Sequence, residues 1–193
     1  MNVVIIDYGA GNIQSVIFAL KRLGVSAVLS ADPEVIKKAD KVIFPGVGHA
    51  AAAMEKLKKS GVDSMIPHLK QPVLGICLGM QLMCESSEEG NTPCLGIFKG
   101  RVQAFDSRLK VPQIGWNTIE DCQGPLFKGI STAAYIYMVH SYYIPMSEQT
   151  IATCTYGISY SAALSKNNFY GTQFHPEKSS SVGAQILKNF IAL

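Results

Sequence analysis

Cys77 is the residue of this chain whose surroundings most clearly indicate nucleophilic chemistry. It lies in residues 75–79, Gly-Ile-Cys-Leu-Gly, directly after the apolar pair at 73–74. Small residues on both sides of a nucleophile permit the sharp strand-to-helix turn that exposes its side chain, as in the Gly-x-Ser-x-Gly elbow. A thiol at the start of a helix also lies at the positive end of the helix dipole, which favours the thiolate. The pattern predicts an activated cysteine, with a buried structural cysteine as the alternative.

A base for this thiol is offered by His175, which follows the apolar run 169–174 and precedes Pro176 and Glu177. Glu177 can orient one ring nitrogen of the imidazole while the other nitrogen faces the sulfur. A nucleophile, a base and an orienting carboxylate form a generalised catalytic triad. A surface histidine in a turn would explain the second segment alone. The two segments together favour Cys77, His175 and Glu177 as the catalytic residues.

A glycine-rich loop at 45–48, Pro-Gly-Val-Gly, follows a predicted strand and is a candidate for stabilising negative charge. A backbone N–H of this loop, at Val47 or Gly48, would pair with the N–H of Leu78, just after the nucleophile, to form an oxyanion hole. One such donor typically lowers the barrier by about 2.7–4 kcal/mol. A plain turn is the alternative explanation for these glycines.

Further polar residues near these motifs are candidates for binding a substrate. Gln81 lies four residues after Cys77, which is one helical turn further along the same face. His140, Ser141 and Tyr142 end another predicted strand. There they either contact a polar substrate or serve as ordinary loop residues.

The composition is that of one compact globular domain spanning residues 1–193. Charged residues make up 16% and hydrophobic residues 48% of the chain, so a sizeable core is expected. The net charge of +3 and the lack of basic runs interleaved with aromatics argue against nucleic-acid binding. The glycines at 9 and 11 would suit a dinucleotide loop, but Gln14 stands where its third glycine belongs, so a tight turn or a partner contact is favoured.

The cysteines, the histidines and the N-terminus indicate the compartment. The five cysteines form no Cys-x-x-Cys pair and the four histidines are scattered, so free thiols, a reducing cytoplasm and no metal site are expected. The chain starts directly with an apolar strand and does not resemble a signal peptide. Residues 129–147 carry no formal charge, but their polar side chains argue against a membrane span.

Strands and helices alternate along the first half, which predicts a parallel sheet covered by helices on both faces. The second half adds short strands, several of them antiparallel, before a last helix. Because parallel sheets bind ligands at the carboxyl ends of their strands, the glycine-rich turns are expected at one edge. The expected strands are 3–7, 27–29, 42–44, 73–76, 101–105, 135–139, 151–156, 160–164 and 169–174. The expected helices are a segment capped by Asn12 and ending at 23, one opening at 32–33, and 50–59, 78–85 and 182–192.

Taken together, these motifs closely resemble the class I, or triad, glutamine amidotransferases. The likeness rests on residues 75–81 and 173–177, and it extends through 7–12, 45–48, 115–117, 140–142 and 176–179. It implies a flavodoxin-like, three-layer α/β fold and the release of ammonia from glutamine without a metal or organic cofactor. It also implies the triad Cys77, His175 and Glu177, glutamine contacts at Gly46, Gln81, Ser141 and Tyr142, and oxyanion donors at Val47, Gly48 and Leu78.

Within the family, the chain resembles subunits that form a heterodimer with a (β/α)₈-barrel cyclase. There, ammonia meets a phosphoribulosyl-formimino-carboxamide nucleotide and gives imidazole glycerol phosphate for histidine biosynthesis. The positions implied to touch this partner are Asn12, Trp116, Tyr137 and Lys178. Residues 112–114, Pro-Gln-Ile, depart from relatives that often carry a histidine and a methionine there, which concerns only the detail of the interface.

Three other interpretations fit parts of the sequence. An amidotransferase subunit serving another acceptor would carry the same triad. A different cysteine hydrolase would use the same sheet, although His175 and Glu177 near the C-terminus argue against it. A binding module without activity would have no need of an intact triad.

The glycines of the 45–48 loop further suggest that a peptide flip switches the oxyanion hole between resting and active states.

Overall fold

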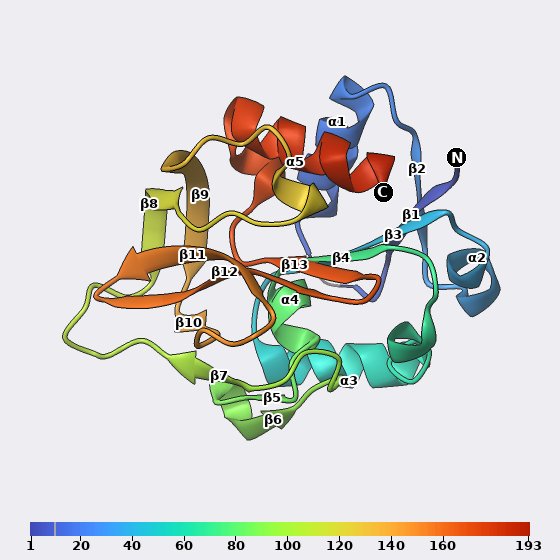
Figure 1. The fold of residues 1–193 in the computed structure, drawn as a ribbon. Helices are drawn as coiled ribbons and strands as arrows, with labels where there is room; N and C mark the ends of the chain where they lie inside the picture. Colours follow the sequence, from blue (N-terminus) through green and yellow to red (C-terminus); the bar gives the residue numbers. More distant parts are fainter. Residues whose placement is uncertain (10) are drawn as a thin grey trace.

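The computed structural model describes residues 1–9 and 11–193, so Ala10, in the turn expected at 9–11, lies outside the described residues. Its centre is a seven-stranded sheet in the order β11-β12-β13-β4-β3-β1-β2 (Figure 1). The run β2-β1-β3-β4-β13 is parallel and has the 2-1-3-4-5 order of flavodoxin-like folds. The strands are β1 (Val3–Ile6), β2 (Ala27–Ser30), β3 (Lys41–Gly46), β4 (Val73–Cys77), β11 (Thr150–Tyr156), β12 (Ile158–Lys166) and β13 (Phe169–Thr172).

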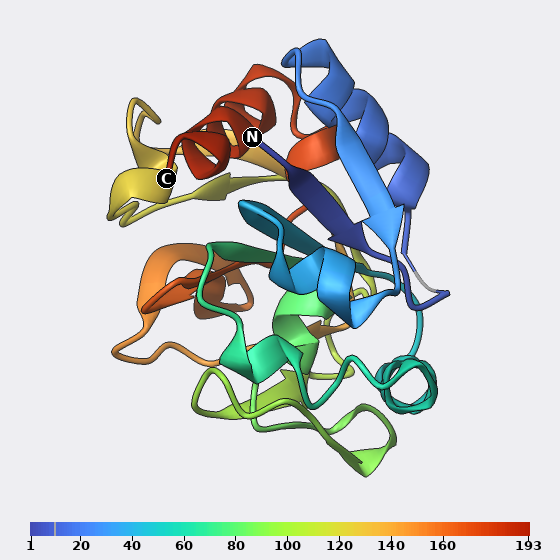
Figure 2. The same ribbon diagram turned by 90° about the vertical axis from the view of Figure 1, so that its right-hand side faces the viewer.

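Helices cover both faces of this sheet (Figures 1 and 2). One face packs against α1 (Ile13–Arg22) and α5 (Ser180–Ala192), and the other against α2 (Pro33–Lys37), α3 (Ala50–Ser60) and α4 (Leu78–Leu82). Side chains of β1 alternate between two buried clusters, because successive residues of a strand point to opposite faces. The predicted three-layer α/β fold with a mostly parallel sheet is therefore confirmed.

The second half adds antiparallel structure, as expected, and more of it than the sequence predicts. β11 and β12 form an antiparallel hairpin at one edge of the main sheet. A ribbon of β8 (Gln113–Ile119) and β9 (Ala134–His140) stands beside it, and β8 was not predicted. A small four-stranded sheet contains β5 (Ser86–Ser87), β6 (Thr92–Pro93), β7 (Arg101–Ala104) and β10 (Tyr142–Tyr143). Short 3₁₀ turns are η1 (Ile66–His68), η2 (Glu89–Asn91), η3 (Pro125–Phe127) and η4 (Pro176–Lys178).

The helix after Cys77 ends earlier than predicted, at Leu82 rather than at residue 85. The N–H groups of residues 83–85 do not continue the α-helical pairing. Those of Met83 and Cys84 donate three residues back, to Met80 O and Gln81 O at 3.1 Å, and that of Glu85 donates to Gly100 O at 3.2 Å. The expected Asn12 cap is also wrong in detail, because its side chain makes no capping hydrogen bond to α1.

The close fit between β3 and the start of α4 explains the glycines around the cysteine. Gly46 pairs with Cys77 in the parallel register of β3 and β4. A Cβ on Gly79 would overlap the carbonyl oxygen of Phe44, so only glycine permits this approach. Cys77 itself has φ +53°, a strained backbone for a non-glycine residue and one often found at functional sites.

Some features concern the whole molecule. All five cysteines are free, as expected. Within residues 1–9 and 11–193, no group of three or more metal-ligating side chains comes together. No helix in the same described part has the length and apolar character needed to span a bilayer.

Candidate active site

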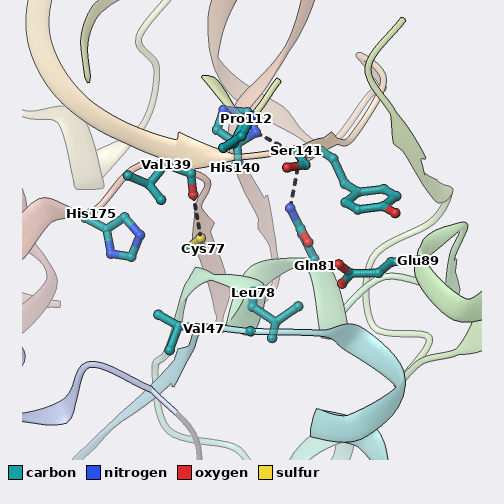
Figure 3. A pocket seen from close by; sticks show the side chains of 12 residues that line it. Val47, Cys77, Leu78, Gln81, Glu89, Pro112, Val139, His140, Ser141 and His175 are labelled. Atoms are coloured by element: carbon teal, nitrogen blue, oxygen red, sulfur yellow. Dashed lines mark hydrogen bonds between the residues drawn. The ribbon is translucent and has the colours of Figure 1, made fainter. Parts of the chain in front are cut away.

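A cavity of about 250 Å³ opens at the carboxyl ends of β3 and β4. Figure 3 shows Cys77 between His175 on one side and Gln81 and Glu89 on the other. The edge of the sheet predicted from the glycine-rich turns therefore does carry a cavity. Its lining residues are Val47, Gly48, Cys77, Leu78, Gln81, Glu89, Pro112, Val139, His140, Ser141, Tyr142 and His175.

Cys77 stands at the junction of β4 and α4 and is 7% exposed. Its sulfur lies 3.7 Å from the carbonyl oxygen of Val139, to which the thiol donates. It also accepts a hydrogen bond from Gln173 Nε2 at 3.7 Å. The strained turn thus places the thiol among hydrogen-bonding partners at the wall of the cavity.

Three hydrogen bonds, one from the ring and two from the backbone, hold His175 in place. Its Nδ1 lies 2.8 Å from Oε1 of Glu177, and both side chains are buried. Its backbone N–H donates to Tyr137 O at 3.0 Å, and its carbonyl accepts the Ser179 hydroxyl at 2.7 Å. With Nδ1 engaged by the carboxylate, Nε2 is the ring nitrogen left for the sulfur of Cys77, which lines the same cavity.

The two histidines at the cavity have opposite electrostatic environments. Burial alone lowers the pKa of His175, but hydrogen bonds to Cys77 and Glu177 and the charges of both outweigh it and raise the pKa to about 10. Burial lowers the pKa of His140 to about 4, although its hydrogen bond to Tyr142 O at 2.8 Å opposes the shift. We therefore expect an imidazolium at position 175 and a neutral ring at position 140 at neutral pH.

NMR titration of labelled histidines is expected to separate these two rings. His175 should stay protonated through pH 8 and titrate near pH 10, well above the ordinary 6.5. Because the folded form binds this proton more tightly than the unfolded chain, the associated stability is complete below pH 6.5 and is lost as pH rises through about 10. In Cys77→Ala the midpoint of His175 should fall, since the hydrogen bond and the negative charge that the Cys77 sulfur contributes are gone. Equal midpoints for His175 and His140 would contradict this electrostatic picture.

The structure brings most of the predicted oxyanion and substrate residues to the cavity. Val47, Gly48 and Leu78 line it, and Gly48 has φ +99°, which suits glycine alone. Gly46 is buried at the end of β3 beside Cys77 and does not line the cavity. The oxyanion role of the first three residues and the substrate role of Gly46 remain predictions.

The remaining substrate candidates share the far wall of the cavity. Gln81, Ser141 and Tyr142 all line it. Gln81 Nε2 donates to Tyr142 O at 3.1 Å and to Gln173 Oε1 at 2.9 Å, so its amide orientation is fixed. This arrangement leaves the carbonyl oxygen of Gln81 for a ligand, but substrate binding by these residues is still a prediction.

Three of the four residues predicted to touch a partner form one cluster on the outer side of β8 and β9. The rings of Trp116 and Tyr137 lie 5.9 Å apart, and Lys178 Nζ lies 5.9 Å from the centre of the Tyr137 ring. Trp116 is 54% exposed. Asn12 directly precedes α1, which packs against η4, the turn that carries Lys178.

Four residues at the site were not singled out by sequence reasoning: Glu89, Pro112, Val139 and Gln173. Glu89 and Pro112 reach the cavity from loops whose course no periodicity reveals. Val139 acts through its carbonyl, which every residue possesses. Gln173 had a usable signal, because it lies two residues before His175 in a strand predicted to end at the site.

Comparison with known proteins identifies the class. The family model of class-I glutamine amidotransferases matches residues 4–193. The chain therefore belongs to the class I glutamine amidotransferase family. A solved structure from Thermoplasma acidophilum, that of a putative GMP synthase subunit, has the same fold, with a TM-score of 0.76 at 21% identity over 100% of this chain and 92% of that one.

Curated relatives define the branch of the family. The chain is 59% identical to imidazole glycerol phosphate synthase subunit HisH of Bacteroides fragilis, over 100% of both sequences. It is 49% identical to the HisH subunit of Haemophilus influenzae, which covers 99% of this chain and 97% of that protein. The chain is thus a class I glutamine amidotransferase of the HisH type.

Proposed function

We propose that this chain is the glutaminase subunit of an imidazole glycerol phosphate synthase. It would hydrolyse glutamine and pass ammonia to a (β/α)₈-barrel cyclase subunit in histidine biosynthesis. The observation that carries the proposal is the strained Cys77 in one cavity with His175, whose Nδ1 is held by the buried Glu177. The HisH names of its relatives support the choice of acceptor pathway. We propose one amidotransferase domain over residues 1–193, acting in the cytoplasm.

In this proposal the reaction begins at the sulfur. The Cys77 thiolate attacks the carboxamide carbon of glutamine, and the N–H groups of Leu78 and of Val47 or Gly48 stabilise the oxyanion. Protonated His175 gives its proton to the leaving ammonia. The same imidazole then activates water, which hydrolyses the γ-glutamyl thioester to glutamate and restores the thiol. Such acid–base assistance typically contributes about 10²–10⁴-fold.

Glu89 is well placed to hold the other end of the substrate. Among the described residues that line the cavity, it is the only carboxylate. Its Oε2 accepts the N–H of Ala50 at 2.6 Å, which fixes the side chain against the start of α3. We propose that its other oxygen binds the α-ammonium group of glutamine, while Gln81, Ser141 and Tyr142 contact the remaining polar atoms.

Glu89→Gln is expected to raise KM for glutamine by about tenfold or more and to change kcat little, because a charge-assisted hydrogen bond is lost equally from ground and transition states. The amide oxygen of the new side chain can still accept from Ala50. Glu88→Gln is the matched control, since Glu88 points away to Ala104 N and Arg101. Steady-state kinetics decide the matter, and an unchanged KM in Glu89→Gln would exclude this role.

The partner would dock on the outer face of β8 and β9, over Trp116, Tyr137 and Lys178, with Asn12 nearby. Ammonia released into water would be protonated and would lose its nucleophilicity, so the chemistry requires a docked acceptor. An exposed indole with an adjacent aromatic ring and a cation is typical of the residues that dominate protein interfaces.

Purification with candidate partners tests the whole proposal. The chain should bind a (β/α)₈-barrel cyclase, and the complex should convert the formimino-carboxamide nucleotide to imidazole glycerol phosphate with glutamine as the nitrogen donor. Glutamine hydrolysis in a complex with a different acceptor enzyme would retain the chemistry but overturn the pathway. No glutaminase activity with any acceptor would overturn the proposed reaction itself.

A further inference from the structure

Gln173 is a fully buried glutamine, 0% exposed, that contacts the reacting sulfur. It follows β13, which pairs in parallel with β4 so that Thr172 stands opposite Ile76. The next residue along each strand brings Gln173 beside Cys77. The contact is therefore a consequence of sheet register, and Gln173 Nε2 reaches Cys77 Sγ at 3.7 Å.

The direction of this hydrogen bond is set by a chain of polar groups. The carbonyl of Tyr142 can only accept, so Gln81 must present its NH₂ group there, at 3.1 Å. The same NH₂ donates to Gln173 at 2.9 Å, so Gln173 must present its oxygen to Gln81. Its own NH₂ then has to face the sulfur. The orientation of both amides thus follows from one backbone carbonyl.

The two neighbours of the sulfur favour opposite protonation states. Val139 O can only accept, so it binds the protonated thiol and repels the thiolate. Gln173 can only donate in its fixed orientation, so its bond strengthens when the sulfur becomes negative. Burial of this amide makes the difference larger, because hydrogen bonds to charge are stronger where water is excluded.

We propose that Gln173 is a further catalytic residue, whose amide donates to Cys77 Sγ and stabilises the thiolate that attacks glutamine. The inference rests on the proposed function for its role in turnover. In the ion pair with His175 the S–H bond has broken, its proton is the one held on Nε2 of the imidazolium, and the electron pair stays on sulfur. Gln173 keeps its own protons throughout. The imidazolium expected at His175 is the partner that such a thiolate requires.

Alkylation of Cys77 tests this directly in the full-length protein, because iodoacetamide reacts with the thiolate. The rate at a fixed pH is followed by mass spectrometry of the peptide that contains Cys77. In Gln173→Met, which is similar in length but has no donor, the rate should fall by about tenfold, because the hydrogen bond that stabilises the thiolate is lost. Gln173→Glu, which faces the sulfur with a carboxylate, should lower the rate further.

Gln113→Met is the matched control. Gln113 is also buried, 4% exposed, and accepts a hydrogen bond from the Tyr160 hydroxyl at 2.9 Å. Its alkylation rate should equal that of the unaltered protein, with circular dichroism confirming that the variants fold. If the methionine variant fails to fold, Gln173→Glu, which is closer in shape to glutamine, decides the question.

Two results would overturn the proposal: an unchanged alkylation rate in the folded Gln173 variants, or an equal loss of rate in Gln113→Met. Alkylation requires neither glutamine nor a partner, so it remains decisive if the proposed glutaminase reaction proves wrong. Where the reaction is present, kcat for glutamine hydrolysis should fall in Gln173→Met by at least the factor seen in alkylation at the same pH.

Discussion

Cys77→Ala is expected to lower kcat for glutamine hydrolysis by at least about 10⁴-fold, because no other thiol stands among the described residues that line the cavity. The substitution removes one sulfur atom and leaves the cavity walls in place. Partner binding should be retained, since none of the proposed contacts, Trp116, Tyr137 and Lys178, lines the cavity that holds the thiol. Ammonia release in a coupled assay and co-purification with the cyclase measure the two effects.

Cys122→Ala is the matched control for this experiment. Cys122 is also a free thiol, half-buried, and it does not line the cavity. Its replacement should leave kcat within about twofold of the unaltered protein, as is usual for substitutions away from the chemistry. Glutamine hydrolysis that survives in Cys77→Ala would end the triad assignment, whatever the partner does.

Glutaminase turnover should rise by about 100-fold when the cyclase and its nucleotide ligand are added, if the active arrangement is populated at only about 1% in the free protein. Two observations suggest such a resting state. The thiol donates to Val139 O, an acceptor that opposes thiolate formation. The loop that would supply the oxyanion donor contains Gly48, at φ +99°, so a change of peptide orientation there carries little steric cost.

β9 joins the face proposed for the partner to the Cys77 sulfur. Tyr137 contributes to the outer cluster, and Val139, two residues later in the same strand, holds the thiol. The Tyr137 carbonyl also accepts the His175 N–H at 3.0 Å. Docking on this face can therefore shift the residues that decide whether Cys77 is a thiol or a thiolate. Trp116→Ala should weaken the stimulation at a fixed cyclase concentration, and full turnover by the isolated chain would contradict the resting state.

The fold could be predicted where local pattern and tertiary structure agree. Alternating apolar strands and helices in the first half predict a parallel sheet, and the strand order places β1, β3 and β4 side by side. Prediction was weaker at α4, which ends early, and in the second half, where β8 was missed. In both places the backbone is committed by partners distant in sequence, such as Gly100 for the N–H of Glu85 and β9 for β8.

The candidate site likewise contains residues that the sequence could predict and residues that it could not. Cys77, His175 and Glu177 could be named from the sequence, because each requires a particular side chain in a recognisable local turn. Glu89 and Val139 could not, since one reaches the cavity from a loop and the other contributes only a carbonyl. The expectation that the glycine-rich turns lie at the carboxyl edge of the sheet was correct, because parallel strands end on the same side.

The sequence alone determined the candidate nucleophile and its backbone setting: Gly75 and Gly79 are the residues that a strained elbow at Cys77 needs, and side-chain chemistry is local. Only the tertiary structure decided what surrounds the sulfur. Gln173 stands at Cys77 because β13 lies next to β4, and Val139 O reaches it because β9 folds over the sheet edge. Hydrogen bonds act over a few ångströms in space and are indifferent to separation along the chain, so this environment existed only once the sheet was assembled.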